Sequence, residues 1–186
     1  MKNDIILAGV GGQGVLSIAS VLAKAAAEAG LTVRQSEVHG MAQRGGAVLS
    51  HLRISGAAIA CDLIPRGKVD VILSMELLES LRYMDFLAPD GAIVTASEPL
   101  VNIDNYPDPA AIVAEINHRG PPSRIIEASA LAQQTGNRRA INMVMAGAAS
   151  RFLRDIPLLI FENVIKTIFA SRSPEANIEA FRLGRA

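Results

Sequence analysis

The sequence predicts an α/β fold of three layers, in which a Rossmann-like, mostly parallel sheet contains a hairpin-like β pair and precedes a helical C-terminal third. Three observations support this class. The first forty residues read as strand, glycine turn, helix and strand. Hydrophobic residues form 50% of the chain and the mean hydropathy is +0.30, as expected where parallel strands are buried on both faces. No repeat, low-complexity run or linker interrupts the 186 residues, so we expect one domain over residues 1–186.

The N-terminal segment predicts a βαβ unit. Residues 4–9 are a short apolar run closed by glycine, which indicates a buried strand that ends at a turn. Residues 14–29 are rich in Ala, Leu and Lys and are followed by Gly30, which is typical of a helix with a glycine stop. Residues 31–38 then predict the next strand. The expected apolar stripe of the helix is Leu16, Ala19, Leu22 and Ala26.

The following segment indicates that the sheet is not purely parallel. Residues 47–54 alternate between two faces, and Ser55-Gly56 then turns the chain into residues 57–64. This pattern predicts a hairpin-like pair. One face carries Val48, Ser50, Leu52 and Ile54, and the other carries Ala47, Leu49, His51 and Arg53.

The rest of the chain alternates strands and helices before it becomes helical. Asp108-Pro109 supplies an N-cap and a first-turn proline for one helix, and Ser173-Pro174-Glu175 caps the last, which we expect to stop at Gly184. The expected elements are a strand at 69–74, a helix at 75–87, a turn at 89–91, a strand at 92–97, a loop at 98–110, a helix to 118, a strand at 123–128, a short helix from 130, and helices at 138–153, 157–170 and 174–184.

Composition excludes several classes of function. Lys+Arg and Asp+Glu both number 18, aromatic residues form 4% of the chain and Trp is absent, so the charge and the stacking groups of a nucleic-acid binder are missing. Cys61 is the only cysteine, so an internal disulfide, a cysteine zinc site and an iron–sulfur cluster are excluded, and we expect it as a small buried residue. We expect no signal peptide, no membrane span and a cytoplasmic location.

The spacing Gly9-x-Gly11-x-x-Gly14 resembles a dinucleotide-binding fingerprint between a strand and a helix. Such glycines allow close approach of the backbone to an anion at the helix N-terminus. The acidic residue that should hold the ribose is missing, because the second strand reads Arg34-Gln35-Ser36 there and Glu37 comes too late. Three interpretations stay open: an NAD(P) or flavin cofactor, another phosphate-bearing ligand, and a purely structural turn.

A second polar loop follows the second strand and should lie at the same edge of the sheet. His39, Gln43 and Arg44 supply hydrogen-bonding groups, and Gly45 and Gly46 leave the backbone bare. Such a loop suits a carboxylate, a phosphate or the polar loop of a partner. Alone, His39 is better explained as a histidine that hydrogen-bonds the loop.

Four segments together resemble the γ-type domain of the 2-oxoacid:ferredoxin oxidoreductases, and most closely the small (β) subunit of the indolepyruvate enzymes. The resemblance covers essentially the whole chain. The glycine turn alone is a weak signal, and its combination with the second loop is strong. The segments are GVGGQGVL at 9–16, SEVHGMAQRGGAV at 36–48, AINMVMAGA at 140–148 and NIEAFRLG at 177–184.

The resemblance implies that a large partner subunit carries thiamine diphosphate and the iron–sulfur clusters. The assembly would convert an aryl pyruvate and coenzyme A to acyl-CoA and CO2 while reducing ferredoxin, and this chain would be inactive alone. It implies a shared-site or interface role for this chain, with no cofactor bound by this chain alone, coenzyme A as a candidate ligand shared with the partner, and no metal or catalytic residue. The implied site residues are Gly9, Gly11, Gly12, Gln13, Gly14, His39, Gln43, Arg44, Gly45 and Gly46.

Two other functions remain as alternatives. The glycine spacing is compatible with an autonomous NAD(P)- or flavin-binding protein, and the interaction surface alone is compatible with a regulatory or scaffolding module. The segment after Pro157 is apolar around more of its circumference than one buried stripe needs, so we expect one face to pack on the sheet. The remaining apolar surface should lie either under the final helix or against another chain, and the second case predicts a homodimer or larger assembly of the isolated chain. The residues concerned are Leu158, Leu159, Phe161, Ile165, Ile168 and Phe169.

Overall fold

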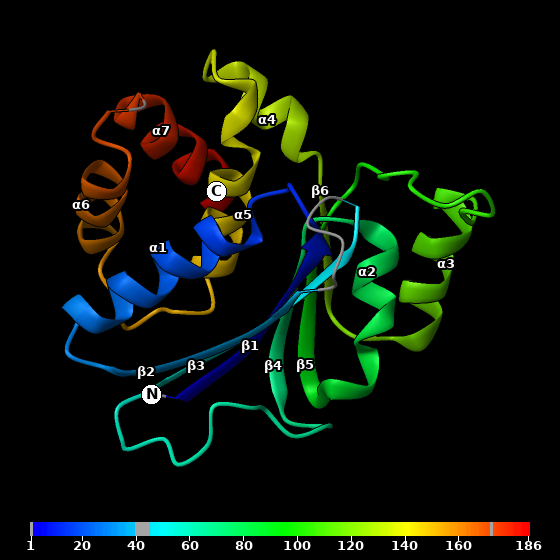
Figure 1. The fold of residues 1–186 in the computed structure, drawn as a ribbon, viewed down its shortest axis with the longest axis horizontal. Coiled ribbons are helices and arrows are strands. Elements are labelled where there is room, and N and C mark those ends of the chain that lie inside the picture. The colour runs from blue at the N-terminus through cyan, green and yellow to red at the C-terminus, as the bar shows by residue number, and fades with distance from the viewer. Residues whose placement is uncertain (1, 40–44, 172) are drawn as a thin grey trace.

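A computed structural model of the protein describes residues 2–39, 45–171 and 173–186, and its centre is a six-stranded sheet in the order β2-β3-β1-β4-β5-β6 (Figure 1). The strands β1, β4, β5 and β6 are parallel neighbours, whereas β3 lies antiparallel between β1 and β2. The predicted mixed α/β class is confirmed. The strands are β1 (Lys2–Val10), β2 (Thr32–His39), β3 (Ala47–Ser55), β4 (Val69–Ser74), β5 (Leu87–Ala96) and β6 (Ser123–Ile126).

Helices cover both faces of the sheet and give the three predicted layers (Figure 1). On one face α1 and α5 contact the strands, and α6 and α7 pack on these two helices. On the other face α2 contacts β1, β4 and β5, and α3 packs on α2. The helices are α1 (Val15–Glu28), α2 (Leu77–Arg82), α3 (Pro109–Arg119), α4 (Ala128–Gln134), α5 (Ile141–Ser150), α6 (Leu158–Ile168) and α7 (Pro174–Arg185), with short 3-10 turns η1 (Met84–Phe86) and η2 (Arg138–Ala140).

The predicted βαβ unit is wrong in one respect. The strands β1 and β2 point the same way and α1 connects them, but β3 lies between them, pairing Leu7 with Ser50 on one side and Gln35 with Leu52 on the other. In α1, Ala19, Leu22 and Ala26 are buried as expected, but Leu16 is exposed.

The hairpin-like pair exists, but its partner strand is different from the one predicted. The partners of β3 are β1 and β2, and the chain after Ser55 contains no strand until β4. Side chains of β3 hold this connection: Arg53 Nη1 donates to the carbonyls of Cys61 (2.9 Å) and Leu63 (3.2 Å), and His51 Nδ1 accepts from Ile64 N–H (3.2 Å). Cys61 is exposed, contrary to the expected burial.

A predicted helix and turn were also misplaced in the middle of the chain. The helix expected over 75–87 ends at Arg82, and the predicted turn at 89–91 lies inside β5. The pairing of β4 with β5 is irregular between Val69 and Val71, which pair with Leu87 and Ala92, so β5 bulges between these two pairs. At Gly91, a Cβ atom would lie 2.7 Å from the carbonyl oxygen of Val69, so this bulge needs glycine.

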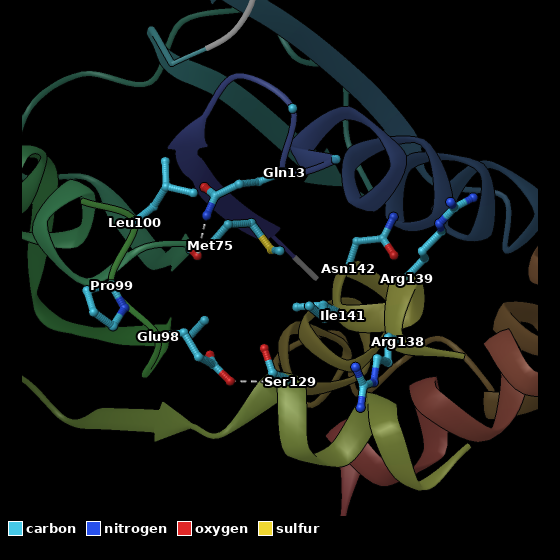
Figure 2. Close-up of a pocket in the computed structure, with 13 residues that line it drawn as sticks. Gln13, Met75, Glu98, Pro99, Leu100, Ser129, Arg138, Arg139, Ile141 and Asn142 are labelled. Atoms are coloured by element: carbon cyan, nitrogen blue, oxygen red, sulfur yellow. Dashed lines mark hydrogen bonds between the residues drawn. The ribbon is translucent and has the colours of Figure 1, made fainter. Parts of the chain in front are cut away.

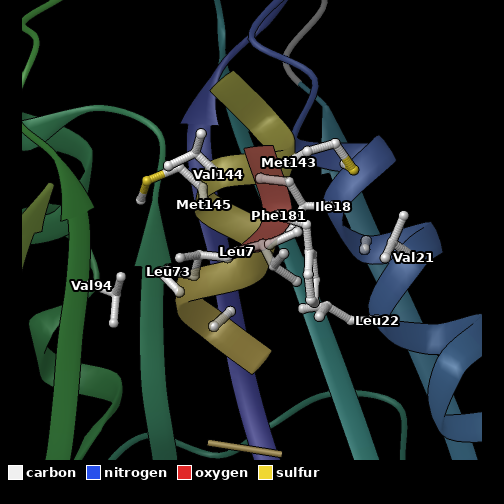
Figure 3. Packing of buried hydrophobic residues seen from close by; sticks show 14 of the residues in the cluster. Leu7, Ile18, Val21, Leu22, Leu73, Val94, Met143, Val144, Met145 and Phe181 are labelled. Carbon is white, nitrogen blue, oxygen red and sulfur yellow. The ribbon is translucent and has the colours of Figure 1, made fainter. Parts of the chain in front are cut away.

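The helices α5 and α7 cross at very short range. A Cβ atom at Gly147 would lie 2.0 Å from the carbonyl oxygen of Phe181, and one at Gly184 would lie 1.8 Å from that of Val144. Gly184 is therefore a packing residue inside α7, which continues to Arg185, and not the predicted helix stop. The expected cap at Ser173 makes no side-chain hydrogen bond. Figure 3 shows side chains of α1, α5 and α7 meeting beside the sheet, with Phe181 among them.

Candidate functional site

The glycine turn connects the end of β1 to the start of α1. Gly12 (φ 104°) and Gly14 (φ 80°) have left-handed backbone conformations that favour glycine. Gly9 lies below the turn, where a Cβ atom would come within 2.8 Å of Val15 Cγ2. Gln13 braces the turn: its Oε1 accepts from Val10 N–H (2.7 Å) and its Nε2 donates to the carbonyl of Met75 (3.1 Å) (Figure 2). The side chain of Gln13 therefore shapes the turn.

The second glycine loop meets the first, as predicted. Gly11 N–H donates to the carbonyl of Gly46 (2.8 Å), and Gly45 N–H donates to the carbonyl of Gly11 (3.4 Å). The carbonyl of Gly45 also accepts from Asn102 Nδ2 (2.9 Å). His39 ends β2 opposite Val48, whereas the predicted site residues Gln43 and Arg44 lie outside the described residues.

A cleft of about 550 Å³ opens beside the glycine turn. It lies where the ends of β1, β4 and β5 meet the start of α1, which is the edge of an α/β sheet where ligands usually bind. Of the predicted site residues, Gly12, Gln13 and Gly14 line this cleft. The other lining residues are Met75, Ala96, Glu98, Pro99, Leu100, Ser129, Arg138, Arg139, Ile141 and Asn142.

Two neighbouring arginines make one side of the cleft cationic. Arg138 and Arg139 form part of η2, across from Pro99 and Leu100 in Figure 2. Both are exposed, and within the described residues neither guanidinium is held by a hydrogen bond or an ion pair. Gly14 caps α1 without a side-chain hydrogen bond, so no capping side chain competes with a ligand for the first amides of this helix. Free guanidinium groups and a helix N-terminus together suit a phosphate.

The opposite wall is apolar and contains one carboxylate that is already engaged. Met75, Pro99 and Leu100 line it, and Glu98 Oε1 accepts from Ser129 N–H at the start of α4 (2.7 Å). The cleft therefore combines a cationic side with an apolar side. Such a site fits an elongated ligand with phosphate at one end and a less polar arm at the other.

Residues of the types that bind metals are dispersed over the described ranges, residues 2–39, 45–171 and 173–186. Within those ranges, His, Cys, Asp and Glu form no cluster of three that could hold a metal ion. Burial, with the nearby charge of Arg53, lowers the pKa of His51, which keeps this imidazole neutral and able to accept from Ile64. Nor is any helix among the described residues long and apolar enough to cross a membrane.

The geometry also explains why the dinucleotide fingerprint is incomplete. Because β3 separates β2 from β1, the segment Arg34-Gln35-Ser36 is one strand further from the glycine turn than a ribose-binding residue should be. Arg34 lies 3.7 Å from Asp62, with both side chains about half exposed, so it is engaged away from the cleft. Among the residues that the structure describes, none therefore supplies the ribose contact of an NAD site to this cleft.

Sequence reasoning missed the arginine side of the cleft. Arg138 and Arg139 follow the glycine turn by more than 120 residues and are brought to it by the packing of α5 against α1. The available signal was two adjacent arginines ahead of the segment AINMV at 140–144, where Ile141 and Asn142 also line the cleft.

Comparisons with known proteins agree with this architecture. The family model for pyruvate ferredoxin/flavodoxin oxidoreductase matches residues 4–186. The chain is 33% identical to the indolepyruvate oxidoreductase subunit IorB of Archaeoglobus fulgidus, over 99% of this chain and 94% of that protein. It is 37% identical to the subunit of the same name from Pyrococcus horikoshii, over 98% and 94% of the two chains. It is 32% identical to the 2-oxoglutarate synthase subunit KorC of Methanothermobacter marburgensis, over 100% and 96%.

Solved structures show the same fold. The chain superposes with a TM-score of 0.78 and 27% identity on the 2-oxoglutarate:ferredoxin oxidoreductase of Magnetococcus marinus, solved with 2-oxoglutarate, coenzyme A and succinyl-CoA bound; the match covers 99% of this chain and 30% of that one. It also matches pyruvate oxidoreductase subunit PORC of Thermotoga maritima, with a TM-score of 0.73 and 25% identity over 99% and 95% of the chains.

Proposed function

This chain belongs to the pyruvate ferredoxin/flavodoxin oxidoreductase family and is the small subunit of a 2-oxoacid:ferredoxin oxidoreductase, and on that premise we propose that its cleft binds coenzyme A beside a larger subunit. The observation that carries the proposal is the pair of unengaged arginines opposite an apolar wall, next to the N-terminus of α1. The phosphates of coenzyme A would contact Arg138, Arg139 and the glycine turn. Its pantetheine arm would run along Met75, Pro99 and Leu100.

The larger subunit would supply the redox chemistry. One 2-oxoacid, one coenzyme A and two oxidised ferredoxins would give acyl-CoA, CO2, two reduced ferredoxins and one proton. We assign thiamine diphosphate, the iron–sulfur clusters and the contact with ferredoxin to that subunit. For the clusters the sequence supports this assignment, because the only cysteine of this chain is Cys61 and one thiolate cannot hold a cluster. We propose indolepyruvate as the 2-oxoacid and the cytoplasm as the location. The names of the relatives support the substrate.

Coenzyme A should stabilise the isolated chain, and NAD should not. At a hundred times its dissociation constant, a ligand stabilises the folded state by about 2.7 kcal/mol, which is a rise in melting temperature of roughly 5–10 °C for a chain of this size. NAD(H) or NADP(H) at the same concentration should leave the melting temperature unchanged, because the ribose contact is missing. Differential scanning fluorimetry measures both.

The substitution Arg139→Ala should weaken coenzyme A binding about tenfold or more, since a charge-assisted hydrogen bond contributes about 1.5–3 kcal/mol. The control is Arg154→Ala, which removes an exposed arginine that does not line the cleft. In the assembled enzyme, Arg139→Ala should raise the KM for coenzyme A and leave that for the 2-oxoacid unchanged. An equal response of the two variants in both assays would refute the proposed ligand site.

We also propose that the isolated chain self-associates through a larger surface that includes the start of α6. Contrary to the expected contact with the sheet, α6 packs on α1 and α7 and buries Phe161 and Ile165. Ile168 and Phe169 pack against the core, so the apolar surface left on α6 is Leu158 and Leu159, which are 38% and 64% exposed. Light scattering at micromolar concentration should report a dimer or larger species, and Leu159→Glu should shift it to the monomer. A strictly monomeric wild type would contradict self-association.

A further inference from the structure

One rim of the cleft is an apolar loop that is open to solvent. The rim loop, residues 97–108 between β5 and α3, has no helix or strand and passes above α2 to reach α3 in Figure 1. Its Leu100, Val101 and Ile103 are 37%, 70% and 43% exposed. Leu100 also lines the cleft, so this apolar group continues the apolar wall of the cleft to the surface.

The rim loop is held by a buried carboxylate. Glu76 is 1% exposed, and its Oε1 accepts from Leu100 N–H (3.4 Å) and from the hydroxyl of Tyr106. Its Oε2 accepts from Glu79 N–H (3.0 Å) and caps α2. Burial, together with the hydrogen bond to Glu76, raises the pKa of Tyr106, so this phenol stays a donor at neutral pH.

Two further contacts fix the position of the rim loop. Asn102 Nδ2 donates to the carbonyl of Gly45, which ties the middle of the rim loop to the two glycine loops. At its start, Ser97 N–H donates to the carbonyl of Ile126 (2.8 Å). Hydrogen bonds thus fix the backbone of the rim loop near its apolar side chains. A contact surface that is already ordered loses little conformational entropy on binding.

We propose that Leu100, Val101 and Ile103 form the docking surface for the subunit that delivers the acyl group to coenzyme A, an inference that rests on the proposed function. The acyl group is formed on the larger subunit, and it can reach the thiol of coenzyme A in this cleft only if that subunit covers the mouth of the cleft. The rim loop borders this mouth. The contact area of these three side chains alone is far smaller than the roughly 800 Å² that each partner buries in a stable dimer. A partner that covers the cleft and its rim together satisfies that requirement, whereas a second copy meeting only the rim loop does not.

The test compares two substitutions of the same kind on two exposed apolar residues. Val101→Glu changes the rim loop, and Leu159→Glu changes the start of α6, where the side chain is 64% exposed compared with 70% for Val101. Both variants should melt as the wild type does, because neither side chain is buried. Affinity for the large subunit from the same source, measured by calorimetry, should fall tenfold or more for Val101→Glu and less than twofold for Leu159→Glu.

Each other result has a definite meaning. Wild-type affinity of Val101→Glu, or weakening by Leu159→Glu alone, would overturn the docking surface while leaving the proposed function intact. If the isolated chain self-associates and Val101→Glu, but not Leu159→Glu, makes it monomeric, then a second copy of the chain binds the rim loop. That result would overturn the proposal that the large subunit docks there. Failure of the wild-type chain to bind either coenzyme A or the large subunit counts against the proposed function itself, and the melting experiment with coenzyme A detects this separately.

Discussion

The substitution Gly184→Ala should destabilise the fold by about 3 kcal/mol or more, although alanine is the better helix former by about 1 kcal/mol. The added Cβ atom would lie 1.8 Å from the carbonyl oxygen of Val144 and 2.8 Å from its Cα atom. Backbone atoms cannot rotate away as a side chain can, so α5 and α7 must separate. That separation opens the core around Phe161 and Phe181, whose ring centroids are 5.3 Å apart.

Chemical denaturation measures this loss, and Gly30→Ala is the matched control. Gly30 has a positive φ (79°) and no atom within 4 Å of an added Cβ atom, so its substitution carries only the backbone penalty of about 1–2 kcal/mol. At about 2–4 °C per kcal/mol for a chain of this size, Gly184→Ala should melt at least 6 °C below the wild type. Equal losses for the two variants would mean that the helices adapt and that the crossing is not tight.

The substitution Asp4→Asn should destabilise the fold by about 3 kcal/mol, because it leaves the guanidinium of Arg53, whose side chain is only 16% exposed, without its counter-charge. Asp4 is 1% exposed and accepts from Arg53 Nε (2.8 Å) and Nη2 (3.1 Å). Arg53 in turn holds the carbonyls of Cys61 and Leu63, so the connection between β3 and β4 depends on the same pair. Urea denaturation of both proteins at neutral pH measures the difference.

The difference between wild type and Asp4→Asn should disappear in acid. Burial raises the pKa of the Asp4 carboxyl, but hydrogen bonds from Arg53 and Lys2 outweigh this, and the net pKa lies below the ordinary 3.8. A depressed carboxyl pKa contributes stability above the ordinary value and loses it as the pH falls through the folded value. The difference in unfolding free energy between wild type and Asp4→Asn should therefore be largest above about pH 4 and should shrink below it. The control Glu115→Gln breaks an exposed pair of 2.7 Å and should hardly change stability; a similar loss there would remove the role assigned to burial.

Local sequence patterns correctly predicted those helices and strands whose start and end are both marked by residues close to them in the chain. The strand at 69–74 is confirmed at both ends, because a short apolar run bounded by polar residues has little alternative. The helix that begins at Pro109 is confirmed with its cap, since Asp108 Oδ1 accepts from Ala110 N–H (3.1 Å). The alternation over 47–54 predicted the faces of β3 but not its partners. Side-chain periodicity says which face is buried, not which strand lies alongside.

The candidate site was predicted on its glycine side and missed on its cationic side. The turn at 11–14 and the contact of Gly11 with Gly46 follow from the rule that loops after parallel strands meet at one edge. Arg138 and Arg139 carry no such local signal, because their position depends on how α5 packs against α1 and the sheet. The role of Gln13 as a brace was equally invisible, since its partner Met75 is 62 residues away.

By itself the sequence determined the α/β class, the glycine turn that is compatible with an anion, and the lack of cysteines for an iron–sulfur cluster. It also contained motifs typical of one enzyme family. These features could be predicted because composition, short-range periodicity and turn chemistry are properties of neighbouring residues. The tertiary structure decided the insertion of β3 between β1 and β2, the close crossing at Gly147 and Gly184, and the meeting of two arginines with the glycine turn. Each of these depends on contacts between segments far apart in the chain. Their geometry is selected by packing of the whole core, and no local window of residues contains that information.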